Sequence, residues 1–140
     1  MEQGMAVYPG KIKLVIRYAP FHDGASDIVR ILEAAKKQEK FWETLHLLYA
    51  SQDQWTAHHQ VRLDRVWPLL PRAGLDVARV RKDMNDPEFA RIIEQDLADA
   101  RTLGVHKTPG FFVNGKPLEP FGTKELKDLI EGEIRAQYPP

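Results

Sequence analysis

The chain has 140 residues, of which 20 are basic and 20 acidic, so its formal net charge is zero, and it contains no cysteine. This length suits one domain, and the balanced charge gives no nucleic-acid footprint. No apolar run approaches the roughly 20 residues that a membrane span needs, and without a thiolate neither disulfide exchange nor a cysteine zinc site is available. We therefore expect a single domain over residues 1–140 with no cofactor, and no nucleic acid or membrane among its partners.

The first half of the chain predicts one strand followed by helices. Lys11–Tyr18 alternates basic and apolar residues and then becomes β-branched, which is typical of a buried strand. After a loop, Ser26 is placed to cap a helix that ends in the Lys36–Lys40 region. A second helix is expected from about Phe41 to Ser51, followed by a loop or frayed end over Gln52–His59. Four residues are expected on the inner side of this second helix: Trp42, Leu45, Leu48 and Tyr49.

The second half predicts further helices, a hairpin and a last helix. A short helix is expected over residues 62–70, and Asp76 is placed to cap the next one. Pro87 suits a first helical position, because its missing N–H would be unpaired there in any case, and that helix should run to about Leu103. Asn114–Gly115 between two apolar runs predicts a tight β-hairpin. Thr123 is then placed to cap a C-terminal helix.

Three motifs in this order carry a family resemblance. Residues 13–22 read Lys-Leu-Val-Ile-Arg-Tyr-Ala-Pro-Phe-His, residues 40–43 read Lys-Phe-Trp-Glu, and residues 104–115 place Thr108–Pro109 before the hairpin. From about Tyr8 onward the chain resembles the DsbA-type thiol–disulfide oxidoreductases. The resemblance implies an α/β, incomplete thioredoxin-like fold with a cis Thr108–Pro109 bond. Its parts are a strand, a helical insertion over about residues 27–103, a β-hairpin and a C-terminal helix.

The resemblance also implies that a strand is missing. In the family, a central strand and a helix that carries Cys-x-x-Cys precede the region matching Tyr8–Gly10, and Met5–Tyr8 could be the last turn of that helix. Its absence would leave bare edges on Lys11–Tyr18 and Phe111–Val113, and such edges pair with other chains. We therefore expect a homo-oligomer through the exposed strand edges, most simply a symmetric dimer. The alternative is that these two segments pair directly within one chain.

The resemblance points to a cis-proline loop that orients an extended polypeptide. Two alternatives stay open: Pro109 has only a structural role, and His22 caps a neighbouring helix or packs at a strand end. The candidate polypeptide-binding residues are His106, Thr108, Pro109, Phe21 and His22.

The remaining polar and aromatic groups support no catalytic residue and no metal site. His58 and His59 are adjacent, so they cannot both face one metal from a helix, and zinc usually needs three or four ligands. The acidic residues Glu94, Asp96 and Asp99 are expected as surface charges of one helix. The aromatic residues either line a hydrophobic groove or form the core of the helical insertion, which we favour: Phe41, Trp42, Tyr49, Trp55 and Trp67.

The resemblance suggests a thioredoxin-fold protein related to thiol–disulfide interchange proteins. We predict that this chain is redox-inactive, because the exchange reaction requires a thiolate. Two alternatives are a peptide-binding or chaperone-like module and a fragment of a longer disulfide oxidoreductase, with a misplaced start at Met1 or Met5. An in-frame Cys-x-x-Cys upstream of Met1 would decide for the fragment. With no secretory signal in the sequence as given, a cytoplasmic location is expected, or a periplasmic one for a fragment of a longer secreted protein.

Overall fold

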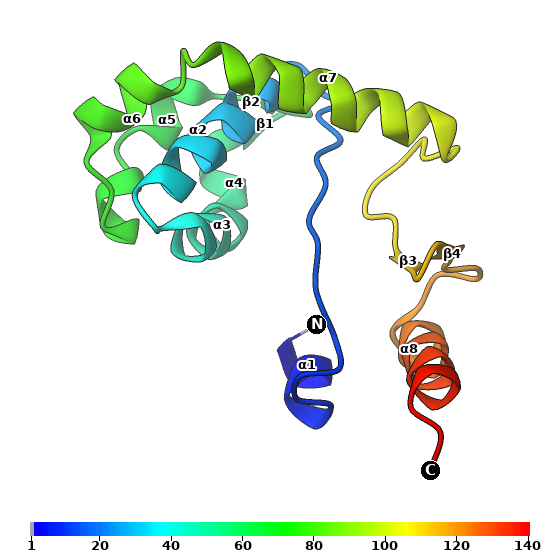
Figure 1. The fold of residues 1–140 in the computed structure, drawn as a ribbon. Coiled ribbons are helices and arrows are strands. Elements are labelled where there is room, and N and C mark those ends of the chain that lie inside the picture. Colours follow the sequence, from blue (N-terminus) through cyan, green and yellow to red (C-terminus); the bar gives the residue numbers. More distant parts are fainter. Residues whose placement is uncertain (1) are drawn as a thin grey trace. The chain divides into compact units, whose positions relative to one another are not determined.

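A computed structural model describes residues 2–140, with side chains from Met5 onward; Met1 lies outside the described residues. The chain divides into two compact units (Figure 1). The helical unit comprises Arg17–Gly104, and the hairpin unit comprises Met1–Ile16 and Val105–Pro140. The expectation of one domain over residues 1–140 stays a prediction, and each unit is described by itself below. No helix in the described part of the chain is long and apolar enough to cross a membrane.

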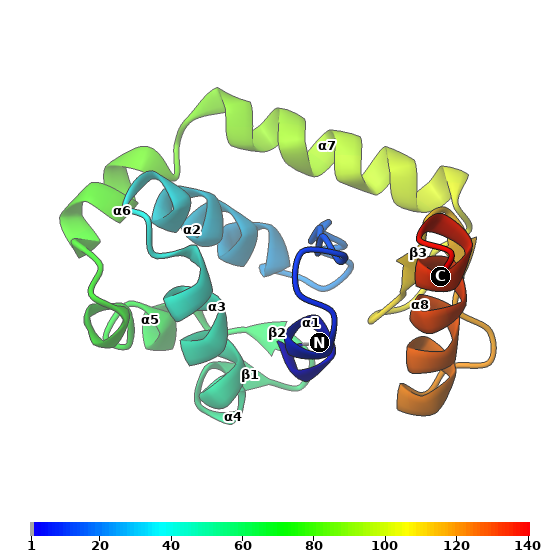
Figure 2. The same ribbon diagram turned by 60° about the horizontal axis from the view of Figure 1, so that its bottom comes forward.

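The helical unit consists of short helices and one small antiparallel hairpin (Figure 2). Two of its helices are longer than the rest, α2 and α7, and each presents one apolar face to the core. In chain order its elements are α2 (Ala25–Lys37), α3 (Phe41–Ala50), α4 (Gln52–Trp55), β1 (Thr56–Ala57), β2 (Gln60–Val61), α5 (Leu63–Val66), η1 (Leu70–Ala73), α6 (Val77–Asp83) and α7 (Pro87–Thr102).

Of the predicted helix caps, Asp76 is confirmed, whereas Ser26 and Thr123 are wrong; the C-terminal helix begins at Thr123 itself and its N-cap is Gly122. Asp76 accepts a hydrogen bond from the Arg79 N–H at 3.1 Å, and Asp86 accepts one from the Glu88 N–H at 2.9 Å. The Ser26 prediction is wrong, because α2 already begins at Ala25 and its N-cap is Gly24. Gly24 has φ of 80°, and a Cβ there would lie 2.9 Å from the Val61 Cβ, so glycine is required at this close approach to β2.

The core of the helical unit is contributed by nearly every element in it. Ile31, Val66, Leu70 and Val80 are completely buried, and none of the buried polar side-chain atoms described in the chain lacks a hydrogen-bond partner. Trp55 is also buried and donates its indole N–H to the Leu48 carbonyl at 3.0 Å. For this tryptophan the core interpretation is therefore confirmed.

The predicted inner side of α3 is half wrong. Leu48 is buried and Leu45 packs against the core, whereas the side chains of Trp42 and Tyr49 are 46% and 69% exposed. The buried face of α3 is formed by Thr44 and Leu48, which lie four residues apart on the same side of the helix. Trp42 and Tyr49 are therefore carried to the outer side. Because α3 is apolar almost all round, its sequence gave little indication of which side is buried.

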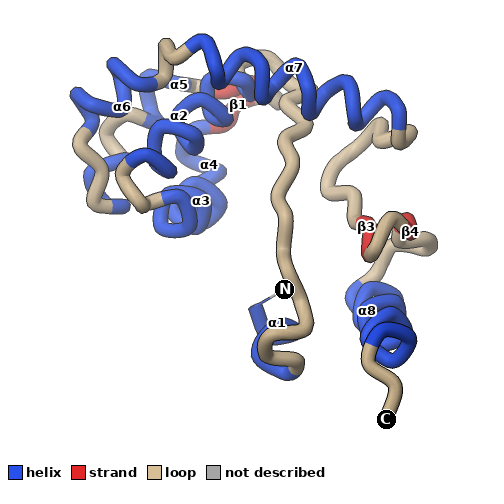
Figure 3. Tube along the Cα trace, viewed as in Figure 1, coloured by secondary structure: helices blue, strands red, loops and turns tan. Residues whose placement is uncertain are grey.

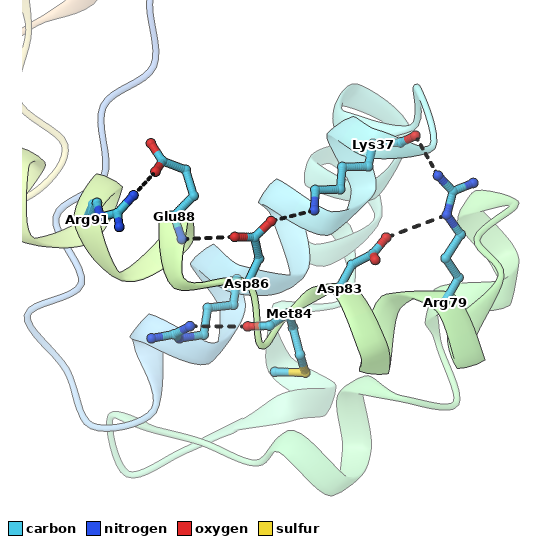
Figure 4. A network of polar contacts seen from close by, with 8 residues as sticks. Lys37, Arg79, Asp83, Met84, Asp86, Glu88 and Arg91 are labelled. Carbon is cyan, nitrogen blue, oxygen red and sulfur yellow. Dashed lines mark hydrogen bonds and ion pairs between the residues drawn. The ribbon is translucent and has the colours of Figure 1, made fainter.

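A polar network holds the end of α2 against the junction of α6 and α7 (Figure 4). Lys37 donates to Asp86 at 2.7 Å, and Arg79 pairs with Asp83 while donating to the Lys37 carbonyl at 3.3 Å. Lys37 also lies 5.0 Å from the centre of the Phe89 ring. The Lys37 ammonium and the Glu88 N–H together hold the pKa of Asp86 below its ordinary value.

The hairpin unit consists of two helices and one hairpin. They are α1 (Glu2–Val7), β3 (Phe112–Val113), β4 (Lys116–Pro117) and α8 (Thr123–Gln137). The predicted Asn114–Gly115 turn is confirmed, with φ of 49° and 81°, as a two-residue hairpin turn of type I′ requires. The predicted C-terminal helix is confirmed, and the Thr108–Pro109 peptide bond is cis, as is Glu119–Pro120.

The predicted strand Lys11–Tyr18 is wrong. Figure 3 shows these residues as loop, and the sheets of the described chain contain only the pairs β1–β2 and β3–β4. The direct pairing of this segment with Phe111–Val113 within one chain is therefore also wrong. A strand exists only where a neighbour completes its ladder, and this segment has none in the described chain. The observed fold is thus mostly helical, with two small two-stranded sheets.

Candidate polypeptide-binding edge

The loop that leads into β3 carries three of the predicted contact residues. His106, Thr108 and Pro109 are all exposed, and the loop continues through Gly110 into the hairpin. These three candidates therefore lie within a few residues of one another and of the beginning of β3. Their backbone and side chains face solvent and are available to a ligand.

The hairpin pairing fixes which backbone groups of β3 remain available. Val113 pairs with Lys116 next to the turn, and the Leu118 N–H donates to the Phe111 carbonyl at 2.9 Å. In an antiparallel pair, hydrogen-bonded and non-hydrogen-bonded positions alternate. Phe111 and Val113 therefore direct their polar groups at β4. The N–H and C=O of Phe112, which lies between them, point away from β4 and form an open edge.

The other edge of the hairpin is closed by a proline. Pro117 stands opposite Phe112, at a position where an N–H would point outward from β4. Proline has no N–H to offer, so a further strand cannot receive a hydrogen bond there. Of the two edges of this hairpin, the β3 edge is consequently the one that suits strand addition.

Side chains hold the hairpin in place and leave apolar surface beside the open edge. Asn114 donates to Glu133 of α8 at 3.1 Å, and Lys116 forms an ion pair with the same carboxylate. These two contacts, with Lys116 the stronger, hold the pKa of Glu133 below its ordinary value. Phe112 remains 39% exposed, and the rings of Phe111 and Phe121 lie 5.9 Å apart.

A second unpaired stretch of backbone belongs to the same unit. Ile12–Ile16 runs as a stretched loop (Figure 3), and within the described chain no backbone hydrogen bond involves these residues. The turn before it is anchored to α8 and to the residue that follows this helix: Tyr8 donates to Glu131 at 2.8 Å, and the Lys11 ammonium lies 5.1 Å from the centre of the Tyr138 ring. Apart from Lys13 the segment is apolar, and Val15 and Ile16 are exposed to solvent.

Phe21 and His22, the other two predicted contact residues, belong to the helical unit. Phe21 is exposed, and the His22 carbonyl accepts a hydrogen bond from the Ala25 N–H at 3.0 Å, at the beginning of α2. The ring of His22 stacks on that of His59 with 6.0 Å between centroids and 27° between planes. The alternative in which His22 supports a neighbouring helix therefore has a structural basis, through its backbone.

The sequence prediction missed a buried carboxylate that fixes the beginning of the helical unit. Asp96 accepts hydrogen bonds from the Tyr18 N–H and from the Arg17 guanidinium, each at 2.7 Å. Arg17 also pairs with Asp99 and, together with Gln95, holds the pKa of Asp99 below its ordinary value.

A surface role for Asp96 is therefore wrong, because its side chain is only 8% exposed. The signal was present in the sequence: Asp96 continues the inward stripe of α7 formed by Ile93 and Ala100. The same anchor includes Tyr18, which donates to the buried Glu33 at 2.6 Å. Burial and this carboxylate raise the pKa of Tyr18 well above its ordinary value.

The described residues contain no group of three or more His, Asp or Glu side chains that could hold a metal ion. A shallow depression on the helical unit runs along a single helix, α7, between Glu88 and Asp96. The depression on α7 does not bring together a nucleophile, a base and a binding cavity. The open β3 edge is the candidate site that the geometry supports.

The sequence profile of the family described as Thioredoxin matches residues 4–132 of this chain. This chain belongs to the thioredoxin family. The match covers both units and confirms the DsbA-type resemblance of the motifs, while the chain itself contains no cysteine. This thioredoxin-family chain therefore has no thiol with which to perform disulfide exchange.

Similar regions occur in much longer proteins. The chain is 33% identical over 125 residues to a Na(+)/H(+) antiporter NhaA of Herminiimonas arsenicoxydans, covering 89% of this chain and 19% of that protein. It is 34% identical over 108 residues to Na(+)/H(+) antiporter NhaA 3 of Salinispora tropica, covering 75% of this chain and 16% of that protein. The chain thus spans less than a fifth of the length of these relatives. No solved structure matches it.

Proposed function

We propose that this chain is a redox-inactive thioredoxin-family domain that binds an extended polypeptide segment along β3. The observation that carries the proposal is the open edge at Phe112, which directly follows the exposed loop of His106, Thr108 and Pro109. The absence of cysteine supports the redox-inactive part, because the attacking group in disulfide exchange is a thiolate.

The binding mode that this edge supports is the addition of a strand. The Phe112 N–H donates to, and its C=O accepts from, one residue of the incoming segment, which gives affinity without a sequence requirement on the backbone. The exposed Phe112 side chain favours an apolar neighbour on the incoming strand. Phe21 and His22 remain candidate polypeptide contacts of the helical unit.

Fluorescence anisotropy with a labelled unfolded polypeptide, reduced and carboxymethylated α-lactalbumin, tests the binding. Substituting Phe112→Pro removes the outward N–H and leaves the groups that face β4 in place, so binding should weaken by about tenfold or more. Tyr49→Ser is the control, because it removes an even more exposed aromatic ring, from α3, and leaves the β3 edge unchanged. Equal binding by the wild type and Phe112→Pro would overturn the proposed edge.

An insulin-reduction assay with dithiothreitol tests the redox part of the proposal. Turnover should not exceed the rate in buffer, because the chain supplies no thiolate. Turnover that follows the purified chain through successive columns would contradict it.

A second candidate function is suggested by the relatives. We propose that this domain serves as an accessory part of a longer protein of the antiporter type, since the matched relatives carry that name and are more than five times as long as the matched region. The reading frame upstream of Met1 is the test. An in-frame series of apolar spans would support the accessory domain, whereas an in-frame Cys-x-x-Cys would support the fragment of a longer oxidoreductase.

A further inference from the structure

The hairpin unit carries two stretches of backbone without hydrogen-bond partners: the open edge of a hairpin, which can receive a strand, and an extended segment, which can supply one. One is the β3 edge at Phe112, and the other is the segment Ile12–Ile16, which has no backbone hydrogen bonds within the described chain. Both are apolar, and both belong to a unit in which none of the side chains described is buried. Unpaired edges of this kind are templates for strand addition.

The segment Ile12–Ile16 has the composition of a β-strand but no strand pairs with it in the described chain. Ile12, Val15 and Ile16 are β-branched, and Val15 is 63% exposed. Tyr8 and Lys11, just before the segment, contact Glu131 and Tyr138 respectively and hold its beginning. A segment held at one end loses less conformational entropy when it pairs than a free peptide does.

We propose that residues 12–16 of one copy of this chain add as a strand to β3 of a second copy, and that residues 12–16 of the second copy add in the same way to β3 of the first. The inference rests on the proposed function, in which the β3 edge receives an extended strand, and it names that strand. Within one described chain the segment and β3 do not pair, and Pro117 closes the opposite edge of the hairpin. Each copy therefore offers one strand and one open edge.

Such an exchange gives a pairing partner both to the open β3 edge and to the segment Ile12–Ile16. A reciprocal contact about a two-fold axis uses both strands and both edges, so no unpaired partner remains. It pairs the outward N–H and C=O of Phe112 and places one of the exposed side chains of Val15 and Ile16 on the same face of the sheet as the exposed Phe112 ring. The hairpin unit would thereby gain the buried apolar surface that it lacks in one copy.

Light scattering after size-exclusion chromatography at tens of micromolar tests the proposal. The wild type should have twice the 16.1 kDa mass of one chain. Two variants should each have the mass of one chain: Phe112→Pro, which disables the edge, and the double variant Val15→Lys with Ile16→Lys, which disables the strand. Tyr49→Ser should dimerise like the wild type, because Tyr49 lies outside the hairpin unit.

Mixing the two disabled variants distinguishes strand exchange from pairing of β3 with β3. Each disabled variant retains what the other lost, so an equimolar mixture should form heterodimers through one intact exchange, with a dissociation constant about tenfold or more above that of the wild type. A mixture that stays at the mass of one chain would overturn the exchange. Dimerisation of the Val15→Lys and Ile16→Lys variant by itself would overturn it as well.

Failure of this inference differs from failure of the proposed function. A wild-type chain at the mass of one copy that still binds unfolded polypeptide through Phe112 would overturn the second copy as occupant and leave the proposed function intact. A wild-type dimer that dissociates on addition of a peptide of residues 10–18 would support both. A dimer that persists in both disabled variants would overturn the exchange.

Discussion

The two units of this chain differ in how they are held together. The helical unit buries side chains from α2, α3, α5, η1, α6 and α7 in one core, whereas every described side chain of the hairpin unit is at least partly exposed. The hairpin unit instead depends on a few polar contacts, such as those of Glu131 and Glu133. Because burial of apolar surface is the main stabilising contribution, the helical unit is expected to be stable by itself and the hairpin unit to need a partner.

Matched truncations in the two units give the largest expected contrast. Leu70→Ala empties a fully buried position and should lower the free energy of unfolding by about 2–5 kcal/mol. Leu129→Ala removes the same atoms from a half-buried position on α8 and should cost about 1 kcal/mol or less. All three tryptophans belong to the helical unit, so fluorescence-detected urea unfolding should respond to Leu70→Ala alone. An equal response to Leu129→Ala would show that the hairpin unit shares the core.

Loss of the buried carboxylate tests the anchor at the beginning of the helical unit. Asp96→Asn should lower the free energy of unfolding by about 1.5–3 kcal/mol, because the Tyr18 N–H and Arg17 lose a charged acceptor. Glu94→Gln is the control, since Glu94 is exposed on the same helix. The urea midpoint detected by tryptophan fluorescence should fall for Asp96→Asn only. Equal midpoints for Asp96→Asn and Glu94→Gln would show that Asp96 contributes no more to stability than an exposed carboxylate.

An exchange of turns compares the two hairpins directly. His58 and His59 occupy the turn of β1–β2 with φ of 50° and 64°, in the left-handed region that costs a non-glycine residue about 1 kcal/mol. His58→Asn with His59→Gly should therefore raise the stability of the helical unit by about 1 kcal/mol, measured by tryptophan-detected unfolding.

The reverse exchange, Asn114→His with Gly115→His, should loosen the β3–β4 hairpin by about the same amount. Faster hydrogen exchange of the Leu118 N–H, which donates to Phe111, would report it. No gain from His58→Asn with His59→Gly would mean that the stack of His59 on His22 offsets the cost of the turn.

Acid should weaken the helical unit by a smaller amount. Asp86 and Asp99 have pKa values below their ordinary 3.8, because Lys37 and Arg17 respectively hydrogen-bond to their charged forms. The folded state therefore binds fewer protons, so this stability is present above about pH 4 and is lost as the pH falls through the lowered values. Urea midpoints measured from pH 6 to pH 3 should decline more steeply for the wild type than for Asp86→Asn. Parallel curves would contradict the role of Asp86.

Features that depend on a few adjacent residues could be predicted from the sequence. Asn114–Gly115 gave the hairpin because both residues tolerate positive φ. Asp76 gave a helix beginning because its carboxylate reaches a nearby backbone N–H, and Pro87 gave another because its missing N–H would be unpaired there. The open edge at Phe112 then follows from the register of the hairpin. This part of the candidate site was thus accessible without a structure.

Features that depend on distant partners could not be predicted. Lys11–Tyr18 has the composition of a strand, but the strand is absent because no neighbour pairs with it in the described chain. The β1–β2 hairpin was missed because His58–His59 carries no turn signal. It forms where β2 packs on the loop before α2, and there the Val61 N–H donates to the Asp23 carbonyl. Tertiary contacts decided both outcomes.

Pro117 also limits how far this chain can assemble. A hairpin with two open edges can receive a strand on each side, and copies joined in that way continue into a filament with no natural end. The proline removes the donor from the β4 side, so strand addition is confined to the β3 edge and copies cannot be joined through both edges of one hairpin. A single proline thus gives the hairpin a direction of assembly, with one side that receives a strand and one that does not.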